Sequence, residues 1–308
     1  MQKIDIISLM RSAISNLRTI VTSMIYGNPS TDKKQKQLST LTEETWQNAM
    51  TGGNAEELEL ANALATDQFT LLFQPILSLS THKIVSAEAL IRWNHPILGT
   101  VSPEHFIHVA EKTGLINDIG AWVMEQACKQ LSSWEKNGLV LQLTINVSAR
   151  QISTGLTPAM ALDAMARHCI SPSSLVFEIT ESYALADVSD AREWIDQMRA
   201  LGFCVYLDDF GIKHSTLLRL HQFSVDAIKI DKSFLDDVTN NKMHYILLNG
   251  MIQLIKAMNL VVIVEGLETM EQLEVLQNFG CTRVQGYLLS KPCGAYEVED
   301  MARRTHLC

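Results

Sequence analysis

The sequence predicts an α/β protein whose main domain is a modified TIM-type (β/α)8 barrel, preceded by a short N-terminal helical extension. Two observations support this prediction. From about residue 68 onward, short apolar segments of strand length alternate with amphipathic segments of helical spacing. The first two apolar segments are joined by only a few residues, "SLSTH", whereas a parallel crossover needs about a dozen or more. We therefore expect the first strand to run antiparallel.

The elements follow in order along the chain. The apolar segments predict eight strands, at residues 70–77, 83–91, 140–147, 174–180, 202–208, 226–231, 260–265 and 283–288. The amphipathic segments predict helices at residues 103–111, 118–136, 156–168, 187–200, 215–222, 241–258 and 268–279. We assign residues 56–308 to this domain and residues 1–55 to an N-terminal helix and a polar linker.

Composition limits the classes of function. The chain has 308 residues, of which 47% are hydrophobic, and this is enough for a large core. Its formal charge of −9 argues against general binding of nucleic-acid polymers, which requires a basic surface. The six cysteines are scattered and form no CxxC pair, so we expect free thiols in a reducing, cytoplasmic compartment and no zinc site.

The N-terminal segment does not resemble a signal peptide or a membrane span, because Asp5, Arg11 and Arg18 interrupt its apolar residues. Those apolar residues recur at helical spacing: Ile6, Met10, Ile14, Leu17, Val21 and Met24. Two interpretations remain open. The helix packs on the main domain, or it serves self-association or an unidentified regulatory partner.

Polar residues stand near the C-terminal ends of seven successive strands: Glu88, Asn146, Glu178, Asp208 with Asp209, Lys229, Glu265 and Gln285. In a barrel these ends meet at one face, where barrel enzymes place their chemistry. One strand-end carboxylate often caps a helix, but five carboxylates on one rim need compensating charge. Oxygen ligands favour Mg²⁺ or Mn²⁺ over zinc. Two such ions serve phosphoester hydrolysis, with Lys229 orienting the water or offsetting the phosphate charge.

An ordered series of motifs covers most of the chain: "FQPI", "AEALIRWNHP", "INVSARQ", "FEITES", "LDDFG", "KIDKSF", "VEGLET" and "VQGYLLSKP". With these motifs, residues from about 60 to 295 resemble the EAL domain family, the cyclic di-GMP-specific phosphodiesterases of bacteria. The resemblance implies a barrel with an antiparallel first strand, two Mg²⁺ or Mn²⁺ ions, and hydrolysis of cyclic di-GMP to linear pGpG. It also suggests a homodimer through the loop after Asp209 and the helix that follows.

The resemblance implies a role for each matching position. The implied metal ligands are Glu88, Asn146, Glu178, Asp208, Asp209 and Glu265, and the implied catalytic residues are Lys229, Glu265 and Gln285. Glu265 is both a metal ligand and the candidate general base, and these two roles stay open. The implied substrate contacts are Gln74, Leu90 and Arg92, although a surface ion pair is a rival interpretation for Arg92. Glu181 resembles the glutamate that anchors the loop after Asp209.

That loop departs from the family pattern. After "DFG" the family has a small residue, a glycine and an aromatic residue, whereas this chain has Ile212, Lys213 and His214. Lysine costs on the order of 1 kcal/mol if the replaced glycine needs positive φ. Lys213 either points to solvent without effect, or the loop is altered for catalysis or tuned to a partner.

Three functions therefore compete: an active phosphodiesterase, a cyclic di-GMP-binding effector with little turnover, and a protein-interaction module. The complete set of implied ligands favours the first, the altered loop favours the second, and the polar rim argues against the third. About sixty residues precede the barrel and no GGDEF sequence is present. We therefore expect no cyclase activity and no typical sensory domain before the barrel.

Overall fold

The structure is a computed structural model that describes residues 53–186, 188–212 and 223–304. The chain divides into two compact units. Among the described residues, the smaller unit consists of residues 53–70 and Arg92–Leu115, and the larger unit consists of Leu71–Ile91 and the described residues from Ile116 onward. The helix and linker predicted for residues 1–55 lie almost wholly outside the described residues, as does the helix predicted at 215–222. The domain boundary after residue 55 therefore stays a prediction.

The described strands are β1 (Phe69–Ser78), β2 (Lys83–His95), β3 (Gly99–Val101), β4 (Gln142–Val147), β5 (Leu175–Thr180), β6 (Cys204–Phe210), β7 (Ala227–Ile230), β8 (Val261–Val264) and β9 (Arg283–Gln285). The described α-helices are α3 (Gly53–Ala65), α4 (Pro103–Thr113), α5 (Ile116–Lys136), α6 (Ala149–Thr154), α7 (Pro158–His168), α8 (Glu181–Ala186), α9 (Val188–Ala200), α10 (Lys242–Ala257), α11 (Met270–Asn278) and α12 (Ala295–Arg304). Two short 3-10 helices, η1 (Pro172–Ser174) and η3 (Lys232–Phe234), precede β5 and follow β7.

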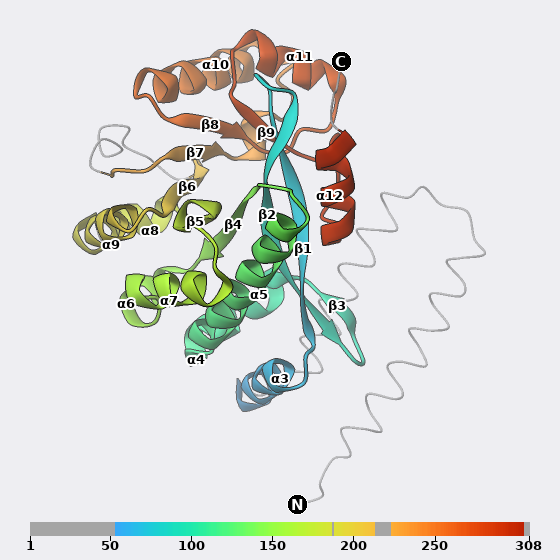
Figure 1. Cartoon of the computed structure of the whole chain (residues 1–308). Coiled ribbons are helices and arrows are strands. Elements are labelled where there is room, and N and C mark those ends of the chain that lie inside the picture. Colours follow the sequence, from blue (N-terminus) through green and yellow to red (C-terminus); the bar gives the residue numbers. More distant parts are fainter. Residues whose placement is uncertain (1–52, 187, 213–222, 305–308) are drawn as a thin grey trace, which may run out of the picture. The chain divides into compact units, whose positions relative to one another are not determined.

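The strands of the larger unit close into a barrel. The order is β1-β9-β8-β7-β6-β5-β4-β2, and a further pairing of β1 with β2 joins the two ends. The strands pair in parallel from β2 to β4, β4 to β5, β5 to β6, β6 to β7, β7 to β8 and β8 to β9. Strand β1 pairs antiparallel with β9, with Ile76 opposite Gln285. The predicted barrel with an antiparallel first strand is confirmed. Figure 1 shows helices α5 to α11 arranged around these strands.

The interior of the barrel explains why polar side chains gather at one end. A buried apolar cluster contains Val176, Tyr206, Ala227 and Ile263, each from a different parallel strand, together with Ile76 of β1. Side chains two positions apart on a strand share a face. Two residues further along the parallel strands stand Glu178, Asp208, Lys229 and Glu265. On the antiparallel β1, the matching residue comes two positions earlier and is Gln74.

The smaller unit has its own aromatic core. Phe69, Trp93 and Phe106 pack against one another, with ring centroids 5.6 to 6.0 Å apart. The indole N–H of Trp93 donates to Oε1 of Gln68 at 2.9 Å, which satisfies the one polar atom of this buried ring. Helix α4 begins with Pro103 and ends before Gly114, whose φ of 91° is the left-handed conformation of a helix C-terminus.

The predicted and observed elements differ in two ways. Strand β9 ends at Gln285 and not at residue 288, because Gly286 turns the chain against the backbone of Leu267, whose amide donates to the Gln285 carbonyl. Prediction also missed short elements, including β3 and α12. Among the described residues, no helix is long and apolar enough to cross a membrane.

Candidate active site

The polar residues at the strand ends converge on one buried ammonium group. Nζ of Lys229 lies 2.7 Å from Glu265 Oε1, 2.9 Å from Glu178 Oε2, 3.2 Å from Glu88 Oε2 and 3.5 Å from Asp208 Oδ1. The Lys229 side chain is 1% exposed and that of Glu178 is fully buried. Four strands that are far apart in the sequence thus contribute one acid each to a single cluster.

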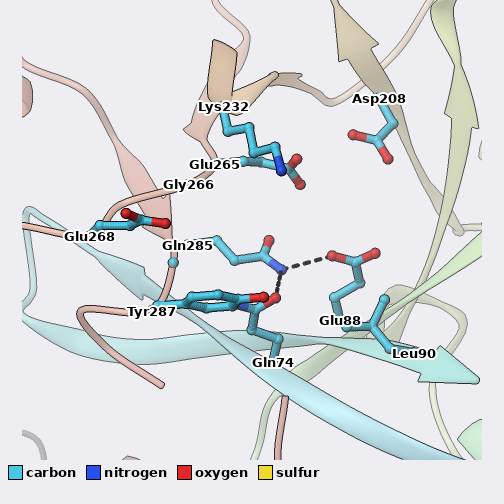
Figure 2. Close-up of a pocket in the computed structure, with 11 residues that line it drawn as sticks. Gln74, Glu88, Leu90, Asp208, Lys232, Glu265, Gly266, Glu268, Gln285 and Tyr287 are labelled. Carbon is cyan, nitrogen blue, oxygen red and sulfur yellow. Dashed lines mark hydrogen bonds between the residues drawn. The ribbon is translucent and has the colours of Figure 1, made fainter. Parts of the chain in front are cut away.

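Two amide side chains hold this cluster in place. Gln285 donates from Nε2 to Glu88 Oε2 at 2.7 Å and to Gln74 Oε1 at 3.1 Å, as the dashed lines in Figure 2 show. Asn146 donates from Nδ2 to Glu88 Oε1 at 2.7 Å. Both oxygens of the Glu88 carboxylate therefore have defined partners, and the side chain of Glu88 is fixed.

Burial and mutual repulsion perturb these acids. Burial raises the pKa of Glu178 well above its usual value, and the neighbouring Glu88 and Asp208 raise it further against the pull of Lys229. Burial likewise raises the pKa of Asp208 and raises the pKa of Glu265 to about 7. Burial also acts on Glu88, but Lys229, Gln285 and Asn146 outweigh it, so the pKa of Glu88 is lowered.

The donor chemistry of the site fits divalent cations. The four acids around Lys229 would carry a surplus of three negative charges if all were ionised, and their mutual repulsion adds to burial in raising the pKa of Glu178 and Glu265. Oε1 of Glu178 is buried and has no hydrogen-bond partner among the described residues. However, no three acidic, histidine or cysteine side chains of the described residues are arranged around one point that could hold a metal ion. The carboxylates converge on Lys229, so cation binding would require them to separate from it.

Asp208 and Asp209 stand at an irregular point of the barrel. The register between β6 and β7 shifts between Leu207 and Phe210, and Asp209 has a φ of 57°. Aspartate is one of the few residues that tolerate this left-handed conformation. The irregularity is local, because the pairing of the two strands resumes at Phe210, opposite Ile230. The Asp209 amide donates to Oδ1 of Asp208 at 2.9 Å.

The loop after Asp209 begins with an anchored glycine. The Gly211 amide donates to Oε2 of the buried Glu181 at 3.0 Å. Gly211 has a φ of 98°, and a Cβ atom there would lie 2.7 Å from the ring of Phe234. Ile212 is 53% exposed. Lys213 and His214, on which the predicted departure from the family depends, lie outside the described residues.

A cavity of about 240 Å³ opens beside the cluster. Its lining contains several of the predicted site residues: Gln74, Glu88, Leu90, Asp208, Glu265 and Gln285. It also contains residues that sequence reasoning did not select: Lys232, Gly266, Glu268, Gly286 and Tyr287 (Figure 2). Lys232 and Glu268 each follow a selected strand-end residue by three positions, and this spacing was the available signal. Arg92 belongs to the smaller unit, so its predicted contact with the ligand stays a prediction.

Comparisons with known proteins give the family. The EAL domain family profile matches residues 57–292. The bifunctional diguanylate cyclase/cyclic di-GMP phosphodiesterase MucR of Pseudomonas aeruginosa is 34% identical over 259 residues, which cover 82% of this chain and 38% of MucR. The cyclic di-GMP phosphodiesterase PA2567 of the same organism is 35% identical over 246 residues, which cover 80% of this chain and 42% of that protein. The chain thus spans about two fifths of the length of these relatives.

A solved structure of the PaMucR phosphodiesterase in complex with c-di-GMP superposes with a TM-score of 0.75 at 33% identity. The match covers 79% of this chain and 99% of that one. The barrel and the motifs at its strand ends therefore agree with a sequence match over most of the chain. This chain belongs to the EAL domain family.

Proposed function

We propose that this chain is a metal-dependent phosphodiesterase that hydrolyses cyclic di-GMP to linear pGpG. The observation that carries the proposal is the cluster of four acids within 3.5 Å of Lys229, at the barrel end where an EAL domain presents its sequence motifs. The names of the relatives support it, since two of them are cyclic di-GMP phosphodiesterases.

We assign two Mg²⁺ or Mn²⁺ ions to the cluster, because the donors are oxygen atoms that carry surplus negative charge. The proposed ligands are Glu88, Asn146, Glu178, Asp208, Asp209 and Glu265. When bound, such ions lower the pKa of a water molecule and stabilise the charge of the phosphoryl group. Oε1 of Glu178, which has no hydrogen-bond partner in the part of the chain that the structure describes, supports this assignment.

The side chains of the protein have separate tasks in this proposal. Lys229 holds the acids together in the metal-free cluster and orients the attacking water once cations bind those acids, and Gln285 orients Glu88 through its amide. Glu265, ionised in the metal-bound site, accepts a proton from the attacking water. The water oxygen bonds to phosphorus, the bond from phosphorus to the 3′-oxygen breaks, and that oxygen takes up a proton. Gln74, Leu90 and Arg92 contact the nucleotide.

A second candidate function is nucleotide binding with little turnover. It is favoured by Ile212, Lys213 and His214, which replace the small residue, glycine and aromatic residue of the family loop. In that case the cluster binds the ligand, but the loop does not organise it for hydrolysis.

A hydrolysis assay separates the candidates. The purified chain is incubated with cyclic di-GMP and either Mg²⁺, Mn²⁺ or EDTA, and nucleotides are resolved by chromatography. We expect pGpG with either metal, none with EDTA, and a large loss in Glu88→Gln, whose amide cannot accept from all the donors now facing the carboxylate. Glu193→Gln, on the exposed face of α9, is the matched control. Binding without pGpG would favour the effector.

Assembly and location are further parts of the proposal. We propose a homodimer through the loop after Gly211, a regulatory partner for the N-terminal segment, and a cytoplasmic location that suits an intracellular nucleotide. Light scattering on the full chain, compared with a chain lacking residues 1–52, tests the first two. A monomer at all concentrations would contradict the dimer.

A further inference from the structure

The cavity beside the cluster is unusually acidic for a site that takes an anionic nucleotide. Four of its lining residues are acids: Glu88, Asp208, Glu265 and Glu268. Among the described residues that line it, Lys232 alone has a cationic side chain. Cyclic di-GMP carries one negative charge on each of its two phosphodiester groups. Metal ions can offset part of the repulsion, and a protein cation that reaches the ligand would reduce it further.

Lys229 does not fulfil this requirement. Its ammonium group is 1% exposed, lies within 3.5 Å of four carboxylates and does not line the cavity. In the metal-free structure the charge of Lys229 is therefore balanced by the acids of the cluster and does not face the cavity.

Lys232 is placed differently. It follows β7 as the first residue of η3, it is exposed, and no carboxylate of the described residues lies within 4.0 Å of its ammonium group. Figure 2 shows this side chain extending into the cavity on the side of Glu265. The ammonium group thus faces the cavity without a direct ion pair to the part of the chain that the structure describes.

The backbone of Lys232 is fixed at the rim, which distinguishes it from an ordinary solvated surface lysine. Asp231 caps η3 by accepting from the Ser233 amide at 2.9 Å. Gly266 packs directly on Lys232, so that a Cβ atom on Gly266 would lie 2.3 Å from Lys232 Cβ, and Gly266 has a φ of 75°. The loop after β8 therefore needs glycine where it meets Lys232, and the base of the lysine side chain is held against the cavity wall.

We propose that Lys232 is the cation that binds a phosphate group of the nucleotide, while Lys229 organises the acids. This inference rests on the proposed function, because it takes a cyclic dinucleotide as the ligand. Ammonium-to-phosphate contacts are charge-assisted and shorter than neutral hydrogen bonds. Lys232 is a binding and positioning residue in this account, and the acids of the cluster perform the chemistry.

The test compares Lys232→Met with Lys232→Arg and with Lys256→Met, a control in the last turn of α10 outside the cavity. Dissociation constants for cyclic di-GMP are measured by calorimetry with Ca²⁺ as the divalent cation in place of Mg²⁺. Chromatography verifies that the nucleotide stays intact during the measurement. We expect Lys232→Met to weaken binding by about tenfold or more and to reduce the dependence of affinity on salt. Lys232→Arg and Lys256→Met should stay near the wild type.

Kinetics in Mg²⁺ complete the test. We expect Lys232→Met to raise KM more than it lowers kcat. If Lys232→Met had the affinity and the salt dependence of the wild type, the inference would be overturned. A loss confined to kcat would also overturn it, because Lys232 would then act on Glu265 and not on ligand binding. If the wild type neither binds nor hydrolyses the nucleotide, the proposed function fails and this inference with it. If the wild type binds and Lys232→Met binds equally well, this inference alone fails.

Discussion

Replacing Glu265 with glutamine should remove a loss of stability that the metal-free wild type suffers as the pH rises, although the same change should remove activity. Burial raises the pKa of Glu265 from its usual 4.5 to about 7. Between these pH values the folded chain therefore holds a proton that the unfolded chain has released. Stability from this group is complete below pH 4.5 and is lost as the pH rises through 7. Glutamine has no proton to lose, so the variant should not show this loss.

The magnitude follows from the shift. The difference between 7 and 4.5 is 2.5 pKa units, which corresponds to about 3 kcal/mol of the free energy of unfolding. Relative to the wild type, Glu265→Gln should gain this amount between pH 4 and pH 8 in EDTA. Divalent cations should reverse the advantage, because they favour the ionised carboxylate of the wild type.

Urea unfolding in EDTA at several pH values measures the effect, with Glu193→Gln as the surface control. The quantity of interest is the difference in the free energy of unfolding between wild type and variant. A difference that stays constant with pH, or that moves against the variant as pH rises, would refute the reasoning about the cluster. The series repeated in Mg²⁺ reports whether the wild type regains stability through cation binding.

Three further predictions concern other parts of the molecule. Burial lowers the pKa of His95, whose Nδ1 accepts from two backbone amides at 3.1 Å. The free energy of unfolding should therefore fall as the pH drops through about 6.5. In unfolding experiments, His95→Gln should remove that dependence on pH. Glu181→Ala should cost about 1–3 kcal/mol in urea unfolding and lower turnover, because the Gly211 amide loses its acceptor; equal turnover would contradict this. Gly286→Ala should cost about 3 kcal/mol or more, since its Cβ would meet backbone atoms at 2.1 Å, whereas Gly99→Ala, with open space around it, should cost about 1 kcal/mol.

Much of the fold was predictable because the barrel strands carry local signals. The short connection before Lys83 predicted the antiparallel first strand, and polar residues at strand ends predicted which side chains meet. On β6 the buried Tyr206 stands two positions before Asp208, and the same spacing recurs on neighbouring strands. This regular spacing explains why the meeting of the polar side chains could be predicted. A strand fixes the facing of its side chains by alternation, and the barrel then brings the ends together.

Other features depend on register and packing between distant segments, which no local pattern encodes. The sequence placed Lys229 on the rim but did not predict that it would lie against four acids. The spacing of Lys232 from Lys229 was the only sequence signal for Lys232, and it does not predict the contact with Gly266 that fixes its position. Strand β3 was missed because its three residues are too few to show a periodicity.

We propose that the acids around Lys229 form a metal-dependent hydrolytic site for cyclic di-GMP. The most direct test follows cyclic di-GMP and pGpG together by chromatography, with the full chain in Mg²⁺ and then after addition of EDTA. The account predicts that pGpG forms in equal amount to the cyclic di-GMP consumed and that EDTA stops the reaction. Intact cyclic di-GMP after prolonged incubation with either Mg²⁺ or Mn²⁺ would contradict the account.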